Sequence, residues 1–128
     1  MKKRIVLFVC SHNGIRSPMA EAFFNQWARH SRAESAGMDP SSSIKPEVVV
    51  VMKERGLDVR AHVPRRLTPH LLSAAYNVIV MGGARFEVKG SHVAEWDVGC
   101  PYGRLDSYRQ TRDELEKRVR ALVKEVDH

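Results

Sequence analysis

The segment Val9-Cys10-Ser11-His12-Asn13-Gly14-Ile15-Arg16-Ser17-Pro18 decides how this chain folds. The apolar, β-branched run Arg4 to Val9 before it is typical of a strand buried on both faces of a parallel sheet. Ser17-Pro18 after it predicts a helix start, with the serine as N-cap and the proline at the first helical position. The segment therefore predicts a strand, a tight loop and a helix, with a cysteine at the carboxyl end of the strand.

Strand and helix patterns alternate along the rest of the chain. We predict strands at 32–36, 77–81 and 93–96, and helices that begin at Pro46, at Pro69 and near Asp106. Gly56 is expected to end the second helix in the left-handed conformation. The last helix carries one apolar face, formed by Leu115, Val119, Leu122 and Val126. This alternation predicts an α/β fold with a parallel sheet covered by helices. Ligands of such sheets bind outside the carboxyl ends of the strands, where Cys10 lies.

Length and composition indicate one globular domain, residues 1–128, with 43% hydrophobic and 28% charged residues. The longest apolar run, Ile5 to Cys10, is too short to span a bilayer. Met1-Lys2-Lys3-Arg4 resembles the start of a signal peptide, but no small-residue cleavage site follows. We therefore expect a soluble, cytoplasmic protein without a membrane partner. Its two cysteines are too few for a disulfide framework and leave room for a reactive thiol.

The net charge of +6 favours anionic partners in general. The densest basic patch contains Arg60, His62, Arg65 and Arg66 without an interleaved aromatic residue, which favours a solvated surface over nucleic-acid binding. His62 and His70 lack ligand-like spacing with a cysteine, so we predict no metal. Gly82-Gly83 lacks the spacing of a nucleotide fingerprint, and no cofactor is predicted.

The loop between the strand and the helix carries the chemistry. Successive backbone N–H groups wrapped around a helix start point at one spot and form an anion nest, and Gly14 supplies the unusual dihedral angles. Arg16 can hold two oxygens of a tetrahedral oxyanion, and the same positive field favours the thiolate of Cys10. Ser17 can donate to that sulfur, and Asn13 can pin the loop. His12 either tunes the charge or packs the loop. The alternative is a buried structural cysteine at the end of a core strand.

The same segment resembles the C-x5-R-S loop of the low-molecular-weight protein tyrosine phosphatases and the related arsenate reductases. The resemblance continues through 19–24, 35–37, 51–58 and 78–82, and from Trp96 through the final helix. It implies a four-stranded parallel sheet flanked by helices, in a single domain, with Cys10 as nucleophile and Arg16 as oxyanion ligand.

Two departures separate this sequence from its apparent relatives. In the family phosphatases, the aspartate of a late Asp-Pro pair protonates the leaving oxygen and later activates water. Here Cys100 precedes Pro101, and Asp97 replaces that acid only if the loop is redrawn. Tyr102 follows where an aromatic residue often lines the entry to the site. In the thioredoxin-coupled arsenate reductases redox cysteines follow the third strand, whereas residues 81–88 contain none.

We expect an arsenate reductase-like enzyme in which Cys10 attacks arsenate. The reductant is a thioredoxin-like protein or a small thiol, or else Cys100 resolves the adduct as a Cys10–Cys100 disulfide. That bridge requires Cα atoms within about 7 Å. The alternatives are a phosphatase acting on phosphotyrosine or small aryl phosphates, with Asp97 as a displaced acid, and a non-catalytic phosphate-binding module. The oligomeric state stays open. The predicted catalytic residues are Cys10, Arg16, Ser17, Cys100 and Asp97, and the predicted substrate-binding residues are Ser11, His12, Asn13, Gly14, Ile15, Arg16 and Tyr102.

Overall fold

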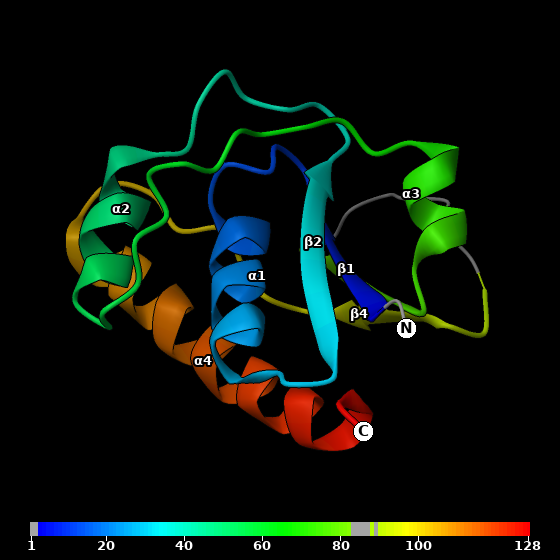
Figure 1. Ribbon diagram of the computed structural model, residues 1–128. Helices are drawn as coiled ribbons and strands as arrows, with labels where there is room; N and C mark the ends of the chain where they lie inside the picture. Colours follow the sequence, from blue (N-terminus) through cyan, green and yellow to red (C-terminus); the bar gives the residue numbers. More distant parts are fainter. Residues whose placement is uncertain (1–2, 83–87, 89) are drawn as a thin grey trace.

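The structure is a computed structural model that describes residues 3–82, 88 and 90–128. Four parallel strands form one sheet in the order β2-β1-β3-β4. In Figure 1, α1, α2 and α4 lie on one side of the sheet and α3 lies on the other. This arrangement confirms the predicted α/β fold class. The strands are β1 (Arg4–Cys10), β2 (Ser31–Gly37), β3 (Asn77–Met81) and β4 (Val93–Trp96), and the helices are α1 (Arg16–Trp27), α2 (Pro46–Lys53), α3 (Pro69–Ala74) and α4 (Leu105–Val126).

The strand register places the carboxyl ends of β1 to β4 at one edge of the sheet. Cys10 at the end of β1 is paired with Gly37 at the end of β2. Met81 at the end of β3 is paired with Trp96 at the end of β4. Because all four strands are parallel, the loops that follow them meet at this carboxyl edge.

Two apolar layers hold the sheet between its helices. On the side of α1 and α4, Phe8 contacts Phe24 and Trp96, with ring centroids 6.1 and 5.9 Å apart. The opposite face carries Leu7, Val9, Val78 and Val80, which pack with Ala36, Ala75 and the partly buried leucines of α3. Each fully buried aliphatic or aromatic side chain contributes about 1.5–3 kcal/mol. Both faces of β1 are covered, which explains its continuous apolar run.

The helix boundaries agree with the predicted starts and stop, except at the start of α1. Thr68 caps α3 by accepting a hydrogen bond from the Leu71 N–H at 3.2 Å. Gly56 has φ +76 and follows α2, and the N–H of Leu57 donates to the Met52 carbonyl in a Schellman arrangement. The prediction that Ser17 caps α1 is wrong, because the helix begins at Arg16 and no side chain caps it. The Ser17 hydroxyl is engaged in the site instead, and Pro18 is tolerated because N–H groups of the first turn have no intrahelical acceptor.

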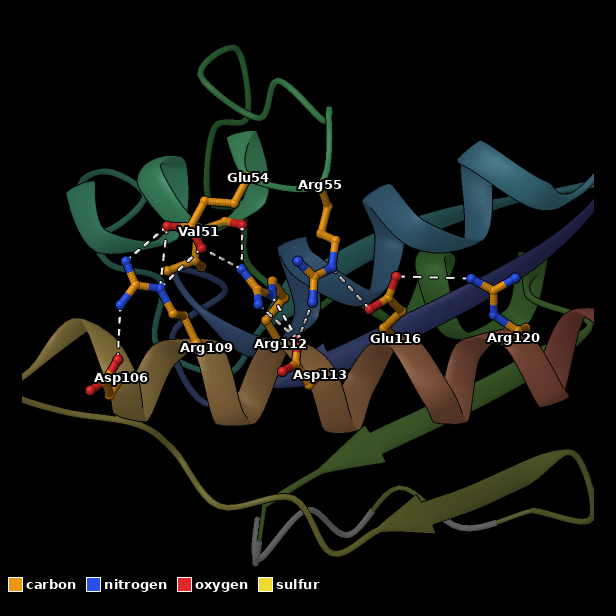
Figure 2. Close-up of polar contacts among 9 residues, drawn as sticks. All are labelled: Val51, Glu54, Arg55, Asp106, Arg109, Arg112, Asp113, Glu116 and Arg120. Atoms are coloured by element: carbon orange, nitrogen blue, oxygen red, sulfur yellow. Dashed lines mark hydrogen bonds and ion pairs between the residues drawn. The ribbon is translucent and has the colours of Figure 1, made fainter.

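A charge cluster fastens α4 to the end of α2 (Figure 2). Arg112 is buried and donates to the Val51 carbonyl at 3.0 Å and to the Glu54 carboxylate at 2.6 Å. Arg109 donates to the same carboxylate at 2.8 Å. Hydrogen bonds from Arg109, and next from Arg112, lower the pKa of Glu54 to about 2. Arg112 and Tyr108 therefore join Leu115, Val119 and Leu122 on the buried face of α4, while Val126 is half-buried.

Within the described part of the chain, no helix combines the length and the apolar character that crossing a bilayer requires.

Candidate active site

Cys10 lies at the floor of the loop that joins β1 to α1. Only 2% of its surface is exposed, and its Sγ lies 2.9 Å from the Ser17 Oγ. Pairing with Gly37 of β2 fixes the cysteine backbone, and Val9 before it is also paired with Val80 of β3. Ser17 is held in the first turn of α1 and is also buried. The fold thus brings together a thiol and a hydroxyl seven residues apart, as the sequence predicts.

Asn13 organises the loop through its side-chain amide, all of whose hydrogen-bonding capacity is used. Its Nδ2 donates to the Ser17 Oγ at 2.8 Å and to the Ser35 Oγ at 2.9 Å. Its Oδ1 accepts the Arg65 backbone N–H at 3.0 Å and lies 3.2 Å from the His62 Nε2. Asn13 also has φ 53, so the left-handed position of the loop belongs to Asn13.

The expectation that Gly14 supplies the unusual dihedral angle is therefore wrong, and Gly14 serves close approach instead. A Cβ at Gly14 would lie 2.6 Å from the Ser41 Oγ, and a Cβ at Gly37 would lie 2.8 Å from the Asn13 N. The segment after β2 runs along the loop and donates N–H groups to the Ser11 and His12 carbonyls. With these carbonyls turned outward and occupied, the loop keeps its path around the start of α1.

The polarity of the hydrogen bonds identifies the donor to sulfur. Ser35 donates its hydroxyl hydrogen to the Glu21 carboxylate, so its oxygen accepts from Asn13. Asn13 Nδ2 uses its second hydrogen on the Ser17 oxygen, which leaves the Ser17 hydrogen free to point at the Cys10 Sγ. The Ser17 hydroxyl is therefore the donor and the Cys10 Sγ the acceptor in this contact.

Arg16 reaches from the start of α1 to the loop that follows β4. Its side chain is 5% exposed, and its Nη1 donates to the Val98 carbonyl at 2.9 Å. Its Nε has no hydrogen-bond partner within the described chain, although it is buried. The guanidinium crosses the end of β3 at Gly82, which has φ +78 and where a Cβ would lie 1.4 Å from Nη1. A glycine is required here because any larger residue would displace the guanidinium.

Sequence reasoning missed five residues that support this site: Gly82, Ser35, Glu21, His62 and Arg65. His62 and Arg65 are predicted to belong to a solvated basic patch; Arg65 is indeed exposed, whereas His62 is half-buried, and both also contact the site. The His62 Nε2 lies 3.2 Å from the Asn13 carbonyl and amide oxygens, both acceptors, so the ring donates from this nitrogen. Arg65 also donates from Nε to the Ser35 carbonyl at 3.0 Å. No spacing in the sequence points to these contacts, because they join segments 22 to 52 residues apart.

The other predicted site residues lie at the rim or beside it. His12 is exposed, and its Nδ1 lies 2.8 Å from the Asp39 carbonyl, in agreement with the loop-packing alternative. Asp97, Cys100 and Tyr102 line a groove of about 390 Å³ with the first half of α4, and Tyr102 is 85% exposed. The residues of the Cys10 loop do not line that groove. The structure thus gathers Cys10, Asn13 and Ser17, holds the Arg16 guanidinium at Gly82 and Val98, and places Asp97, Cys100 and Tyr102 in a separate groove.

Among residues 3–82, 88 and 90–128, no group of three His, Cys, Asp or Glu side chains is arranged to hold a metal ion. The chemistry available at the carboxyl edge of the sheet comes from sulfur, backbone N–H groups and one guanidinium. A buried thiol that accepts a hydroxyl hydrogen, on a loop at a helix start, is suited to attack a bound oxyanion. The fold and the site together define a cysteine-dependent enzyme class that acts on tetrahedral anions.

Comparison with known proteins identifies the family. The family model described as low molecular weight phosphotyrosine protein phosphatase matches residues 5–128. The protein-arginine-phosphatase of Bacillus subtilis (strain 168) is 31% identical, over 94% of this chain and 95% of that protein. Arsenate reductase 1 of Staphylococcus epidermidis is 26% identical, over 98% of this chain and 100% of that protein. The crystal structure of a YwlE mutant from Bacillus subtilis has a TM-score of 0.87 at 31% identity, and the match covers 98% of this chain and all of that one.

This chain belongs to the low molecular weight phosphotyrosine protein phosphatase family, and it is an enzyme with a cysteine nucleophile. The family resemblance inferred from the loop is confirmed. Of the relatives named above, the phosphatase is more similar to this chain than the arsenate reductase. The comparisons therefore support the phosphatase alternative better than the favoured hypothesis of arsenate reduction.

Proposed function

We propose that this protein is a phosphatase that removes a phosphoryl group through a phosphocysteine intermediate at Cys10. One observation carries the proposal: the Cys10 Sγ lies 2.9 Å from the Ser17 Oγ, whose oxygen already accepts from Asn13. This contact positions the sulfur at the floor of the loop, where it can attack a bound phosphorus as a nucleophile.

In the first step the phosphoryl oxygens bind the loop N–H groups and the Arg16 guanidinium. Arg16 is fixed before substrate arrives, because Val98 holds its Nη1 and Gly82 leaves space for it. The sulfur forms a bond to phosphorus while the bond from phosphorus to the leaving oxygen breaks. Fixed donors stabilise the charge that accumulates on the equatorial oxygens without reorganising.

The protonation of the leaving group is where this chain departs from its family. Cys100 stands at the position that the resemblance gives to the acidic aspartate, and a thiol is a weaker acid than a carboxylic acid. Asp97 is the nearest carboxylate in the sequence and is exposed in the groove beside α4. We therefore propose a preference for aryl phosphates, whose phenolate leaving groups depend less on a proton than alkoxides do, and slow release of phosphate from Cys10.

Leaving-group dependence tests this proposal. We expect rapid release of p-nitrophenolate from p-nitrophenyl phosphate, in a burst matching the enzyme concentration, followed by slower turnover. Alkyl phosphates should react far more slowly than aryl phosphates. Cys10→Ser should abolish the burst, and Asp97→Asn should reduce turnover only if Asp97 is the displaced acid. Absence of both a burst and a phosphocysteine adduct would contradict the proposal.

Arsenate reduction is a second candidate, favoured by the similarity to an arsenate reductase along the whole chain. In that reaction Cys10 attacks arsenate and a second thiol attacks the Cys10 sulfur, so that arsenic is reduced as a disulfide forms. A small thiol or a thioredoxin-like protein is the proposed reductant. Mass spectrometry after arsenate treatment, with and without thiols, distinguishes a mixed disulfide from an internal one. An unchanged mass in both conditions would contradict arsenate reduction.

A further inference from the structure

The two faces of the sheet are covered to different extents. In the described part of the chain, α1, α2 and α4 pack on one face, and α3 alone packs on the other (Figure 1). The six residues of α3 make a helix about 9 Å long, whereas the seven residues of β1 extend over about 23 Å. This helix is therefore too short to cover the whole length of the strand beneath it.

A groove of about 840 Å³ lies where the cover by α3 ends, beside the amino ends of β1 and β2. Its apolar lining comes from Ile5 of β1 and from Leu71 and Ala74 of α3. Arg32 of β2 is paired with Ile5 in the sheet register, so the two side chains point to the same face and both line the groove. The groove therefore combines an apolar floor with a charged wall.

The charge of this groove is positive. Lys3, Arg4 and Arg32 line it together with one carboxylate, that of Glu34. Arg65, which lies outside the groove, forms an ion pair with Glu34 at 2.5 Å and compensates its charge. Three cations thus remain to attract an anionic ligand.

Two of these cations are held in position by the protein itself. The Arg4 guanidinium lies 4.5 Å from the centroid of the Tyr76 ring and donates from Nη2 to the His128 carbonyl at 3.1 Å. The Arg32 Nη1 lies 2.9 Å from the Glu34 carboxylate. A guanidinium carries five N–H donors, so these contacts leave others for a ligand. Because both side chains are already positioned, little of their conformational freedom is lost when a carboxylate binds.

We propose that this groove is a docking site for an acidic segment of a partner protein that also carries apolar side chains. Carboxylates of the segment would pair with Arg4 and Arg32, and its apolar side chains would cover the floor formed by Ile5, Leu71 and Ala74. A peptide fits better than a nucleic acid, because Tyr76 is the one aromatic residue of the described lining and Arg4 already stacks on it. A hollow lined by charges also suits a chain segment better than the flat surface of a membrane.

This docking site is separate from the proposed active site. The groove lies at the amino end of β1, where Arg4 is the first residue, and Cys10 is the last residue of the same strand, about 20 Å away. A partner that binds the groove therefore leaves the Cys10 loop open. The inference goes beyond the proposed phosphatase activity and does not depend on it.

Two neighbouring positions of α3 provide a matched test. Ala74 and Ser73 are both exposed, but of the two only Ala74 lines the groove. Ala74→Glu and Ser73→Glu change the net charge of the protein equally, and Ala74→Glu alone places a carboxylate in the groove. The probe is a short, fluorescein-labelled peptide of alternating glutamate and leucine, and its binding to the full-length protein is followed by fluorescence polarisation. We expect Ala74→Glu to weaken binding about tenfold or more, while Ser73→Glu stays within about twofold of the wild type.

Several outcomes would overturn the proposal. No binding of the peptide to the wild type, or equal weakening by the two substitutions, would show that the groove does not dock an acidic segment. Equally tight binding of a glutamate–serine peptide would show that the apolar floor is not used. Tighter binding of phosphatidylserine vesicles or of a single-stranded oligonucleotide, lost in Ala74→Glu, would assign the groove to another class of partner.

Catalytic activity is a separate readout. Hydrolysis of p-nitrophenyl phosphate should be the same in the wild type, Ala74→Glu and Ser73→Glu, because the groove and Cys10 lie at opposite ends of β1. If none of the three proteins hydrolyses phosphate esters, the proposed function fails while the polarisation measurements still decide the docking site.

Discussion

Gly82→Ala should separate the stability of this protein from its capacity to bind anions. Two glycines follow strand or helix ends with nearly the same left-handed backbone, φ +78 at Gly82 and +76 at Gly56. A Cβ costs about 1–2 kcal/mol in this conformation at either position. At Gly56 it would meet no atom of the described chain within 4 Å, whereas at Gly82 it would lie 1.4 Å from the Arg16 Nη1. Gly56→Ala is therefore a control with the same backbone strain and no contact with the site.

The clash in Gly82→Ala is relieved when the far end of the Arg16 side chain moves. The substitution therefore weakens anion binding in addition to straining the backbone. A guanidinium that has left its place gives up two hydrogen bonds to the anion, each worth about 1.5–3 kcal/mol because the groups are charged. The loss of about 3–6 kcal/mol corresponds to about 10²- to 10⁴-fold weaker binding.

Urea denaturation and calorimetric titration with inorganic phosphate measure the two effects separately. We expect both variants to be destabilised by similar amounts, with phosphate binding lost only in Gly82→Ala. Unchanged phosphate affinity in Gly82→Ala would show that Gly82 does not hold Arg16 in place. Equal loss of binding in Gly56→Ala would show that general destabilisation is responsible.

Three further predictions concern Cys100 at the position of the family's acid, Asn13 in the Cys10 loop, and Asp127 near the carboxyl end of the chain. Cys100→Asp should restore an acidic group and raise turnover of alkyl phosphates by about 10²- to 10⁴-fold, measured as kcat, and no increase would contradict the assignment of this position. Asn13→Asp keeps the left-handed backbone but loses the donors to Ser17 and Ser35. Its kcat should therefore fall below that of the wild type, and equal kcat for the two proteins would refute a role for these donors. Burial opposes ionisation of Asp127, but hydrogen bonds led by that from the Arg29 N–H lower its pKa from 3.8 to about 2; stability should therefore be lost as pH falls from about 4 to 2, and Asp127→Asn should flatten that part of the acid-unfolding profile.

Much of the site could be predicted from residues that are neighbours in sequence. Cys10, Asn13, Arg16 and Ser17 lie within one strand-loop-helix segment, and local geometry limits where their side chains can point. The helix stop at Gly56 and the start of α3 at Pro69 are equally local, and both predictions are confirmed. The start of α1 was not predictable in this way, because Ser17 bonds to a sulfur and an amide in preference to its own helix.

Residue order specifies the alternation of strands and helices and the cysteine at a strand end, since burial on two faces and helical periodicity leave direct traces in it. The distant groups that support that cysteine are selected by the folded arrangement of the chain. Arg65 reaches Asn13, Gly82 makes room for Arg16, and Val98 accepts from it, across separations of 52 to 82 residues. These contacts depend on strand order and register, which place chain segments side by side without any required spacing between them. Hydrogen bonds that act over about 3 Å therefore leave no periodic pattern from which they can be inferred.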